Sequence, residues 1–370
     1  MTLSSPAKLT AMSDQEPTRW TLSQAHTWYA QQPRPLGANY LPANAINPLE
    51  MWQAATFDTA RIDLELGWAQ ALGMNVMRVF LHDLLWVQDA AGFKQRIDQF
   101  LAIAARHGIR TMLVLFDSCW DPHPQLGPQR APMPGIHNSG WVQGPSATAL
   151  VDVAYEATLR AYVQDIVGQF GQDPRVWCWD VWNEPDNQGG GMGYYLPQEA
   201  PGKIARVAEL LPQVFAWARD AKPSQPLTSG VWAGEDWSLD APGLNAVQTS
   251  QLNESDVTSF HDYSWPEKFK ARVRQLQTWG RPLLCTEYLA RGNGSTLDGV
   301  LPVAAQEDVG LVNWGFVCGR SQTNFPWDSW KNPYTFAPPQ LWFHDLLHLD
   351  GTPYREREIE LLSHHAALPR

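Results

Sequence analysis

The sequence predicts an α/β protein whose fold is a single closed (β/α)8 barrel, or TIM barrel, with long loops at the carboxyl-terminal face of the strands. Two observations lead to this fold class. Eight short apolar segments alternate with segments of helical periodicity from residue 36 onward, and this order favours a parallel sheet. The apolar segments are nearly continuous, as in parallel strands buried on both faces. A doubly wound open sheet is the alternative, but no Gly-rich phosphate-binding loop follows an early strand.

The predicted elements follow one another in a regular order. Strands are expected at 36–41, 74–81, 109–116, 176–182, 226–232, 256–263, 282–289 and 310–318. Helices are expected at 58–73, 93–107, 148–170, 203–221, 266–279, 297–307 and about 339–349. Asp58 is the expected N-cap of the first of these helices, and Gly73 its end. The GGGMG segment at 189–193 lacks the Lys and the spacing of a phosphate loop, and we interpret it as a flexible lip.

Two parts of the chain are distinguished by composition. Residues 1–35 are polar and hold no clear strand, and we expect an N-terminal extension that packs on the barrel, with a short helix over 20–30. Residues 36–370 are expected to form the catalytic barrel domain. Within it, the Pro- and Gly-rich stretch 117–147 predicts a loop, and a loop of this length inside a compact domain is usually functional.

The charge balance excludes several classes of partner. The chain has 370 residues, with 27 Lys and Arg against 38 Asp and Glu, for a formal charge of −11. Nucleic-acid binding requires clustered basic residues, and no basic run is present. No apolar stretch approaches 18 residues, so no membrane span is expected. The first 14 residues lack an apolar core typical of secretory signals, which predicts a cytoplasmic protein, or a secreted one if the chain was trimmed. We expect a monomer or a small homo-oligomer.

Cysteine and tryptophan usage is also informative. The four cysteines, Cys119, Cys178, Cys285 and Cys318, form no C-x-x-C pair and are expected to be small buried residues on strands rather than zinc ligands or disulfides. No metal or cofactor is expected. The chain has 19 Trp. Most are expected in the core, but a few at strand ends would suit stacking on the C–H faces of sugars.

Active sites of such barrels lie at the carboxyl ends of the strands, and the polar and aromatic residues there form a distinctive set. The candidates are Arg78 and His82 on or after the second strand, Asp117 and Trp120 after the third, Asn183 and Glu184 after the fourth, His261 and Tyr263 on the sixth, Glu287 on the seventh, and Trp314 on the eighth.

Glu184 and Glu287 have the chemistry that glycosidic cleavage needs. One carboxylic acid protonates the leaving oxygen while a second carboxylate attacks or stabilises the anomeric carbon. Strands four and seven lie across the barrel from each other, so their ends can face one another. We therefore predict that both glutamates are catalytic.

The other candidates have roles around this pair. Arg78 is expected to keep one glutamate ionised, and Asn183 to bind a sugar hydroxyl. His261 and Tyr263 point to the same side of their strand and are expected to orient the nucleophile. Trp314 offers a floor for the sugar ring. His82, Asp117 and Trp120 complete the predicted binding residues.

The segments Trp182-Asn183-Glu184-Pro185 and Thr286-Glu287-Tyr288 resemble those of clan A retaining glycoside hydrolases. The order of the candidate residues is similar to that of the cellulase-like glycoside hydrolase family 5 group, over about residues 36–350. The resemblance implies that Glu184 is the acid/base and Glu287 the nucleophile. The sequence FDSCW at 116–120 departs from this group, which often has His there; His123 or His137 is the candidate replacement.

The expected activity is hydrolysis of β-linked glycans or oligosaccharides, with gluco-, manno- or xylo-configured sugars. Walls formed by the loops 117–147, 185–202 and 320–338 would favour an exo-acting enzyme, whereas an open cleft with Trp120, Trp232, Trp237, Trp327 or Trp330 as platforms would favour an endo-acting one. Two other classes are alternatives. One is a carbohydrate-binding barrel without turnover. The other is a metal-dependent barrel hydrolase, which would need a His-x-His near the first strand, and GANYL has none.

Overall fold

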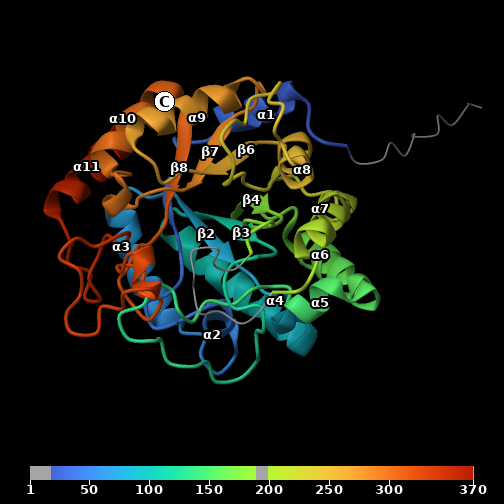
Figure 1. Cartoon of the computed structure of the whole chain (residues 1–370), viewed down its shortest axis with the longest axis horizontal. Coiled ribbons are helices and arrows are strands. Elements are labelled where there is room, and N and C mark those ends of the chain that lie inside the picture. The colour runs from blue at the N-terminus through green and yellow to red at the C-terminus, as the bar shows by residue number, and fades with distance from the viewer. Residues whose placement is uncertain (1–17, 189–198, 370) are drawn as a thin grey trace, which may run out of the picture.

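Eight parallel strands form one sheet in the order β5-β4-β3-β2-β1-β8-β7-β6 in the computed structural model of the chain, which describes residues 18–188 and 199–369 (Figure 1). The strands are β1 (Leu36–Asn39), β2 (Val76–Phe80), β3 (Arg110–Val114), β4 (Val176–Asp180), β5 (Leu227–Thr228), β6 (Thr258–His261), β7 (Leu283–Glu287) and β8 (Val309–Asn313). A parallel bridge between Val231 and Phe260 joins the two ends of this order. The sheet is therefore closed, which confirms the predicted barrel and excludes the open sheet.

Helices surround the strands in Figure 1 and cover the outer face of the barrel. They are α1 (Leu22–Ala30), α2 (Pro48–Trp52), α3 (Thr59–Ala71), α4 (Asp83–Arg106), α5 (Ala147–Val151), α6 (Glu156–Phe170), α7 (Lys203–Asp220), α8 (Ala246–Glu254), α9 (Pro266–Gln277), α10 (Leu297–Glu307) and α11 (Glu356–Ala367). The main core lies between the helices and the strands. Burial of the strands on both faces explains their continuous apolar sequences.

Several predicted boundaries are corrected by local hydrogen bonding. Helix α4 has a kink at Asp89, and the predicted helix 93–107 lies in the segment after it. The segment before the kink, which was not predicted, begins at Asp83, where the His82 side chain accepts from the backbone N–H of Leu84. The helix predicted at 148–170 is divided at Asp152, whose side chain caps a short 3-10 turn before α6. Helix α8 was not predicted, although Asn245 and Gln248 form a capping box at its start.

The helix predicted at about 339–349 is wrong. The backbone there bonds to the segment after β8 rather than to itself: the N–H of Phe343 donates to the Asn324 carbonyl, and the N–H of Leu347 donates to that of Phe316. Leu347 also forms a β-bridge with Val317. These contacts use the backbone donors that a helix would need, and the last helix is α11 instead.

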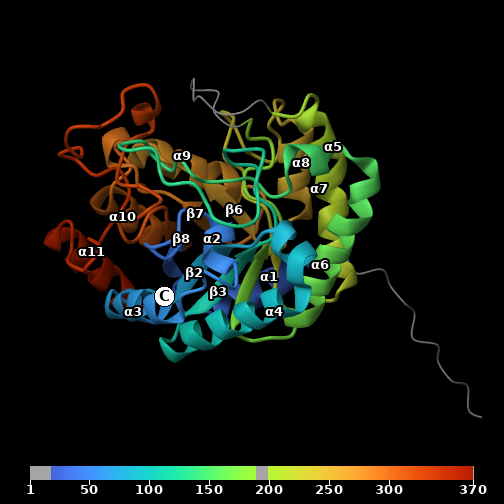
Figure 2. The ribbon, with the colours of Figure 1, turned by 90° about the horizontal axis from the view of Figure 1, so that it is seen from below.

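Helix α1 covers the amino-terminal end of the barrel. Its buried residues Ala25 and Tyr29 belong to an apolar cluster with residues of the strands, among them Trp177. The ring of Trp28 lies 5.4 Å from that of Trp177. The long loops gather at the opposite end, toward the top of Figure 2. No helix among the described residues is long and apolar enough to cross a membrane.

All four cysteines are free, and only two of them lie on strands as expected. Cys178 is on β4 and Cys285 on β7, both buried. Cys119 and Cys318 lie in the segments after β3 and β8. Cys318 is off its strand because β8 ends at Asn313, earlier than predicted, whereas Cys119 already lies beyond the strand predicted at 109–116.

Candidate active site

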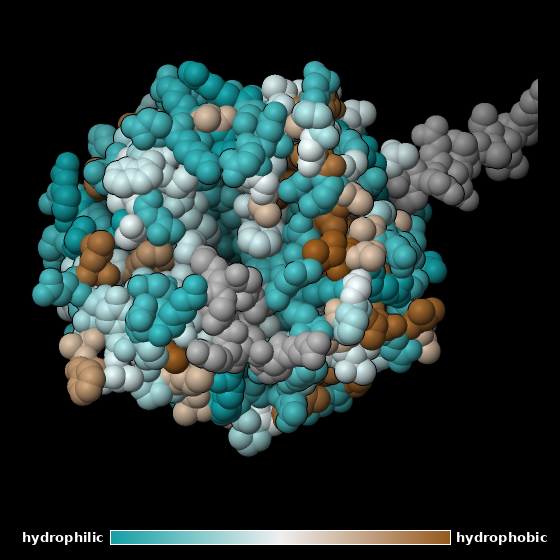
Figure 3. All heavy atoms as spheres, in the orientation of Figure 1, coloured by the Kyte–Doolittle hydropathy of each residue, from teal (hydrophilic) through white to brown (hydrophobic). Residues whose placement is uncertain are grey.

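A cavity of about 480 Å³ lies at the carboxyl ends of the strands, and the face shown in Figure 3 is hollowed near its middle. Of the predicted site residues, those that line this cavity are Trp120, Asn183, Glu184, His261, Tyr263, Glu287 and Trp314. Arg78 is buried beneath it. His82 and Asp117 do not line it. Of the two loop histidines, His137 lines the cavity, whereas His123 is exposed elsewhere.

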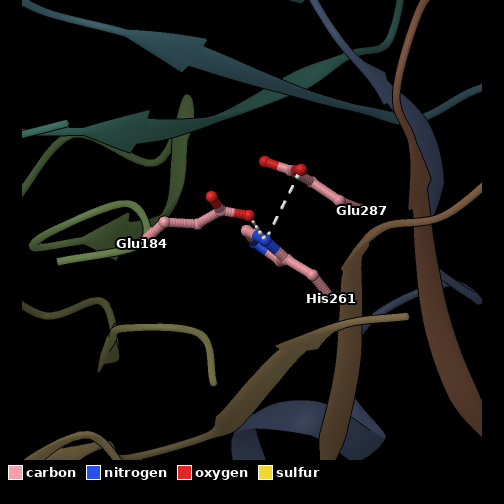
Figure 4. A group of neighbouring side chains, drawn as sticks. All are labelled: Glu184, His261 and Glu287. Carbon is pink, nitrogen blue, oxygen red and sulfur yellow. Dashed lines mark hydrogen bonds and ion pairs between the residues drawn. The ribbon is translucent and has the colours of Figure 1, made fainter. Parts of the chain in front are cut away.

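Glu184 and Glu287 face each other across the barrel mouth. Glu287 is the last residue of β7, and Glu184 follows β4 in a left-handed backbone conformation with φ of 41°. One oxygen of each carboxylate and one nitrogen of His261 all lie within 4.8 Å of one another. Figure 4 shows the two carboxylates approaching the His261 ring from different strands. A non-glycine residue at such a φ carries backbone strain, which is common at active sites.

Arg78 links the polar residues below the cavity. Its guanidinium donates to Oε1 of Glu287 at 2.9 Å, to Oδ1 of Asn183 at 2.6 Å and to Oδ2 of Asp180 at 2.8 Å. Burial opposes the charge of Arg78, but the nearby carboxylates of Asp180 and Glu287 raise its pKa above the ordinary value. Arg78 therefore remains a cation beside Glu287. Asp180 was not predicted as a site residue, although an isolated Asp inside an apolar strand is a signal for an inward-facing ion pair.

Glu287 has a donor on each carboxylate oxygen. Arg78 occupies Oε1, and the Tyr263 hydroxyl donates to Oε2 at 2.6 Å. Burial raises the pKa of Glu287 above its ordinary value, and the neighbouring Glu184 adds to this, while His261, Arg78 and Tyr263 act in the opposite direction. Both donors favour the ionised form that a nucleophile needs.

Glu184 has a different environment. His261 Nδ1 lies 2.9 Å from its Oε1, while the Asn187 amide donates to Oε2 at 2.6 Å and the Cys119 thiol lies 3.3 Å from the same oxygen. Burial raises the pKa of Glu184, and the hydrogen bonds from Asn187 and Cys119 lower it. No cation donates to this carboxyl among the described residues. The two glutamates thus differ in the way that an acid/base and a nucleophile differ.

His261 lies between the two carboxyls. Its Nδ1 is 2.9 Å from Glu184 Oε1 and 3.4 Å from Glu287 Oε2. Burial lowers the pKa of His261 to about 4, so the ring is neutral near pH 7. A neutral imidazole with its proton on Nδ1 can donate to only one of the two carboxyls at a time.

The remaining predicted polar residues act further from the cavity. His82 Nε2 bonds to the Gln143 carbonyl at 2.7 Å, so both ring nitrogens are used in capping and loop contacts. Asp117 accepts from the Asn183 amide at 2.9 Å, and burial raises its pKa to about 6. Asp117 therefore orients Asn183, whose second amide hydrogen remains directed toward the region of Cys119.

Tryptophan rings contribute much of the apolar lining. Trp314 packs edge-on against Phe80, with ring centroids 6.0 Å apart, and Trp232 donates its indole N–H to Asp186 at 2.7 Å. Of the platform candidates, those that line the cavity are Trp120, Trp232, Trp237 and Trp327. Trp330 is buried behind Trp120, with the rings stacked 6.3 Å apart. Apolar ring faces beside converging carboxyls are suited to sugars.

Among the described residues, Glu184, His261 and Glu287 form the one group arranged to offer three ligand atoms to a metal ion. Two features argue against a metal ion at this group. The Arg78 guanidinium already donates to one Glu287 oxygen and Tyr263 to the other. A cation here would also be repelled by the guanidinium charge.

Comparisons with known proteins agree on the architecture. No family model and no curated protein matches the sequence. GH5_18 from Streptomyces cattleya, solved in complex with GlcNAc, is similar with a TM-score of 0.59 and 14% identity, over 91% of this chain and 82% of that chain. The chain shares its barrel fold with this protein.

Two further solved structures have the same fold. The exo-β-1,4-mannosidase Op5Man5 from Opitutaceae bacterium strain TAV5 is similar with a TM-score of 0.59 and 19% identity, over 90% of this chain but only 59% of that chain. The endo-β-1,4-mannanase from Thermotoga petrophila has a TM-score of 0.55 and 13% identity, over 91% of this chain and 77% of that one.

Proposed function

We propose that this protein is a retaining β-glycosidase of the clan A, family 5 type, acting on β-linked glycans or oligosaccharides with gluco-, manno- or xylo-configured sugars. The observation that carries the proposal is the approach of the two carboxyls, with one oxygen of each within 4.8 Å of the other. Retaining enzymes need about 5–5.5 Å between their carboxyl groups, whereas inverting enzymes leave roughly 6.5–9.5 Å for a water molecule. The similarity in fold to mannosidases and mannanases supports the same class.

The two steps of the proposed reaction use the two environments. Glu287, ionised beside Arg78, attacks the anomeric carbon while Glu184 gives its proton to the leaving oxygen, and a glycosyl ester with Glu287 forms. Glu184, now a carboxylate, then takes a proton from water, whose oxygen attacks the anomeric carbon and releases Glu287. Tyr263 donates to Glu287 at 2.6 Å and holds it in place.

Hydrolysis of a panel of dinitrophenyl β-glycosides tests this proposal. The panel contains glucosides, galactosides, mannosides and xylosides, as mono- and disaccharides, and the control is Glu287→Gln, which cannot form the ester. We expect turnover by the wild-type protein and a loss of at least about 10³-fold in the variant. Equal rates for both proteins would contradict the role of Glu287. Binding of these sugars without turnover by the wild-type protein would instead favour a carbohydrate-binding barrel.

A further inference from the structure

Three loops at the carboxyl end of the barrel are hydrogen-bonded into one continuous wall. We define this wall as residues 40–53 after β1, 117–146 after β3 and 314–345 after β8. Because β3, β2, β1 and β8 are neighbours in the sheet, these loops rise from the same side of the barrel. The loops after β3 and β8 lie side by side in Figures 1 and 2.

The loops after β3 and β8 are joined by backbone–backbone hydrogen bonds and by hydrogen bonds that involve the side chains of Gln322, Ser329 and His137. The N–H of Asn138 donates to the Ser321 carbonyl at 2.9 Å, and the N–H of Tyr334 donates to that of Gly135 at 3.0 Å. Gly135 has a φ of 71°, and a Cβ at this position would lie 2.3 Å from the Tyr334 carbonyl oxygen. The close contact between the two loops therefore requires glycine at position 135.

The loop after β1 is joined to both of the others. The Asn47 side chain donates to the Gly140 carbonyl at 2.9 Å. On the other side, the backbone N–H of Arg320 donates to the Ala43 carbonyl at 2.9 Å, and the guanidinium forms an ion pair with Glu50 at 3.1 Å. These contacts make the wall a fixed part of the fold.

The wall stands next to the nucleophile. The ring of Trp327 lies 5.0 Å from that of Tyr263, the residue that donates to Glu287. His344 lies 5.6 Å from the same tyrosine ring and 5.3 Å from His137. Trp327 and His137 both line the cavity. The wall thus contacts Tyr263, the residue that donates to the nucleophile.

Among residues 18–188 and 199–369, none closes the opposite side of the cavity. This side is lined by residues after β5 and on or before α9, among them Trp232, Glu235 and Lys268. The Glu235 side chain is 89% exposed and that of Lys268 is 53% exposed. Trp232 is bonded to Asp186, two residues from the acid/base Glu184. A leaving group must lie beside the acid that protonates it. The wall also reaches Glu184, through Cys119, but only this side leaves room for the leaving group among the described residues.

We propose that the wall closes the cleft at the non-reducing end, so that the protein is exo-acting and releases one terminal sugar at a time from short β-linked oligosaccharides. The proposal rests on the proposed β-glycosidase function. The sugar that is released lies between the nucleophile and the wall, and the remainder of the oligosaccharide extends past Trp232 into solvent. A chain cannot pass through the wall, so internal bonds of a polymer are not reached.

His137 forms the end of the sugar site. It is buried, with 1% of its surface exposed, and its Nδ1 donates to the Phe325 carbonyl at 2.9 Å. Nε2 is then an acceptor, and burial lowers the pKa of His137 to about 4, so the ring keeps this acceptor near pH 7. It is placed to receive a hydrogen bond from a hydroxyl of the terminal sugar.

Three dinitrophenyl β-glycosides of the preferred sugar test the proposal: the monosaccharide, the disaccharide, and the disaccharide carrying a methyl ether on its terminal 4-hydroxyl. We expect immediate dinitrophenol release from the first and release after a lag from the second, with free monosaccharide appearing first. The third should react at least about 10²-fold more slowly than the second. Immediate disaccharide release from both disaccharides would overturn exo action while leaving the β-glycosidase function intact. No turnover of any substrate would instead contradict the function itself.

A pair of glycine variants tests the wall directly. Gly135→Ala places a methyl group against the Tyr334 backbone and should part the two loops. Gly127→Ala is the matched control, because Gly127 is in the same loop and has a φ of 94° but no atom within 4 Å of the added Cβ. We expect Gly135→Ala to raise the rate on the methylated disaccharide relative to the monosaccharide by about tenfold, and Gly127→Ala to leave this ratio unchanged. An unchanged ratio in a folded Gly135→Ala protein would contradict the role of the wall.

Discussion

The thiol of Cys119 lies 3.3 Å from Oε2 of Glu184, the oxygen that also accepts from Asn187. Burial and the nearby carboxylates raise the pKa of the Cys119 thiol well above its ordinary value, so the sulfur keeps its proton and acts as a donor. A hydrogen bond to a carboxyl oxygen favours the ionised form. The hydrogen bond from Cys119 therefore lowers the pKa of Glu184, the proposed acid/base.

Cys119→Ala removes this donor and should raise the pKa of Glu184. The basic limb of the profile of kcat/KM against pH then moves to higher pH, while the rate at the optimum changes by less than about tenfold. Cys119→Ser keeps a donor and should restore the wild-type limb. A basic limb at the same pH in all three proteins would contradict this role of Cys119.

Glu184→Ala should separate substrates by their leaving groups. Dinitrophenolate needs little protonation, so its glycosides should still form the glycosyl ester, whereas substrates with alkoxide leaving groups should lose about 10²–10⁴-fold in rate. Azide can replace water in the second step and should restore part of the activity. The measurement is kcat/KM for both substrate types with and without azide. Equal losses on both, without rescue, would mean that Glu184 is not the acid/base.

Activity should show a bell-shaped dependence on pH. The rate should rise as the proposed nucleophile Glu287 loses its proton and fall as the proposed acid/base Glu184 loses its own. Burial raises the pKa of both carboxyls above the ordinary value of 4.5, so both limbs should lie above it. Because the two carboxyls interact, the two apparent pKa values of the profile describe the pair rather than either residue. A flat profile of kcat/KM between pH 4 and pH 8 would contradict two essential carboxyls.

Removal of metal ions should leave activity unchanged. Both oxygens of Glu287 already accept hydrogen bonds from Arg78 and Tyr263, and the guanidinium charge opposes a cation at Glu184 and His261. The measurement is the hydrolysis rate before and after dialysis against EDTA, together with elemental analysis of the purified protein. Stoichiometric zinc, with activity lost on its removal and regained on its return, would favour the metal-dependent alternative.

His365 on α11 should make the fold sensitive to acid. Burial lowers its pKa to about 4 from the ordinary 6.5, so between these values the unfolded chain binds a proton that the folded chain does not. The free energy of unfolding therefore rises with pH in this window and falls as pH is lowered. Gln does not titrate, so His365→Gln lacks this loss. The free energy of unfolding of the variant minus that of wild type, measured with urea, should therefore be about 1 kcal/mol larger at pH 5 than at pH 7.5. His364→Gln, at an exposed neighbour, is the control, and an equal gain there would contradict the assignment.

The approach of Glu184 and Glu287 could be predicted from sequence because each glutamate ends an apolar strand, where barrel active sites lie. The same rule selected His82 and Asp117, which do not line the cavity. The His82 side chain bonds to the Gln143 carbonyl, and the Asp117 carboxylate accepts from the Asn183 amide. Position after a strand predicts the face of the barrel, but not the direction of a side chain within an irregular segment. Asp180 is the one charged residue of an apolar strand, a pattern that indicates an inward-facing ion pair, but it was not among the predicted site residues.

Other parts of the site had no local signal. Cys119 contacts Glu184 only because the segment after β3 folds back over the barrel, and no spacing rule relates the two. The wall is joined partly by backbone bonds, as between Asn138 and Ser321, which depend little on side-chain identity, and partly by side chains such as Asn47 whose partners lie far away in the sequence. The apolar residues at 339–349 suggested a helix because periodicity does not reveal that their backbone bonds elsewhere.

Glu184 has a left-handed backbone, with φ of 41°. This conformation lowers the stability of the fold at the position of the proposed acid/base. Glycine would adopt this conformation without strain, and a sequence chosen for folding alone would place it there. The chain instead keeps a long charged side chain on a strained backbone. Selection for heat resistance that ignores activity is therefore expected to replace this glutamate by glycine, with loss of the proposed acid/base.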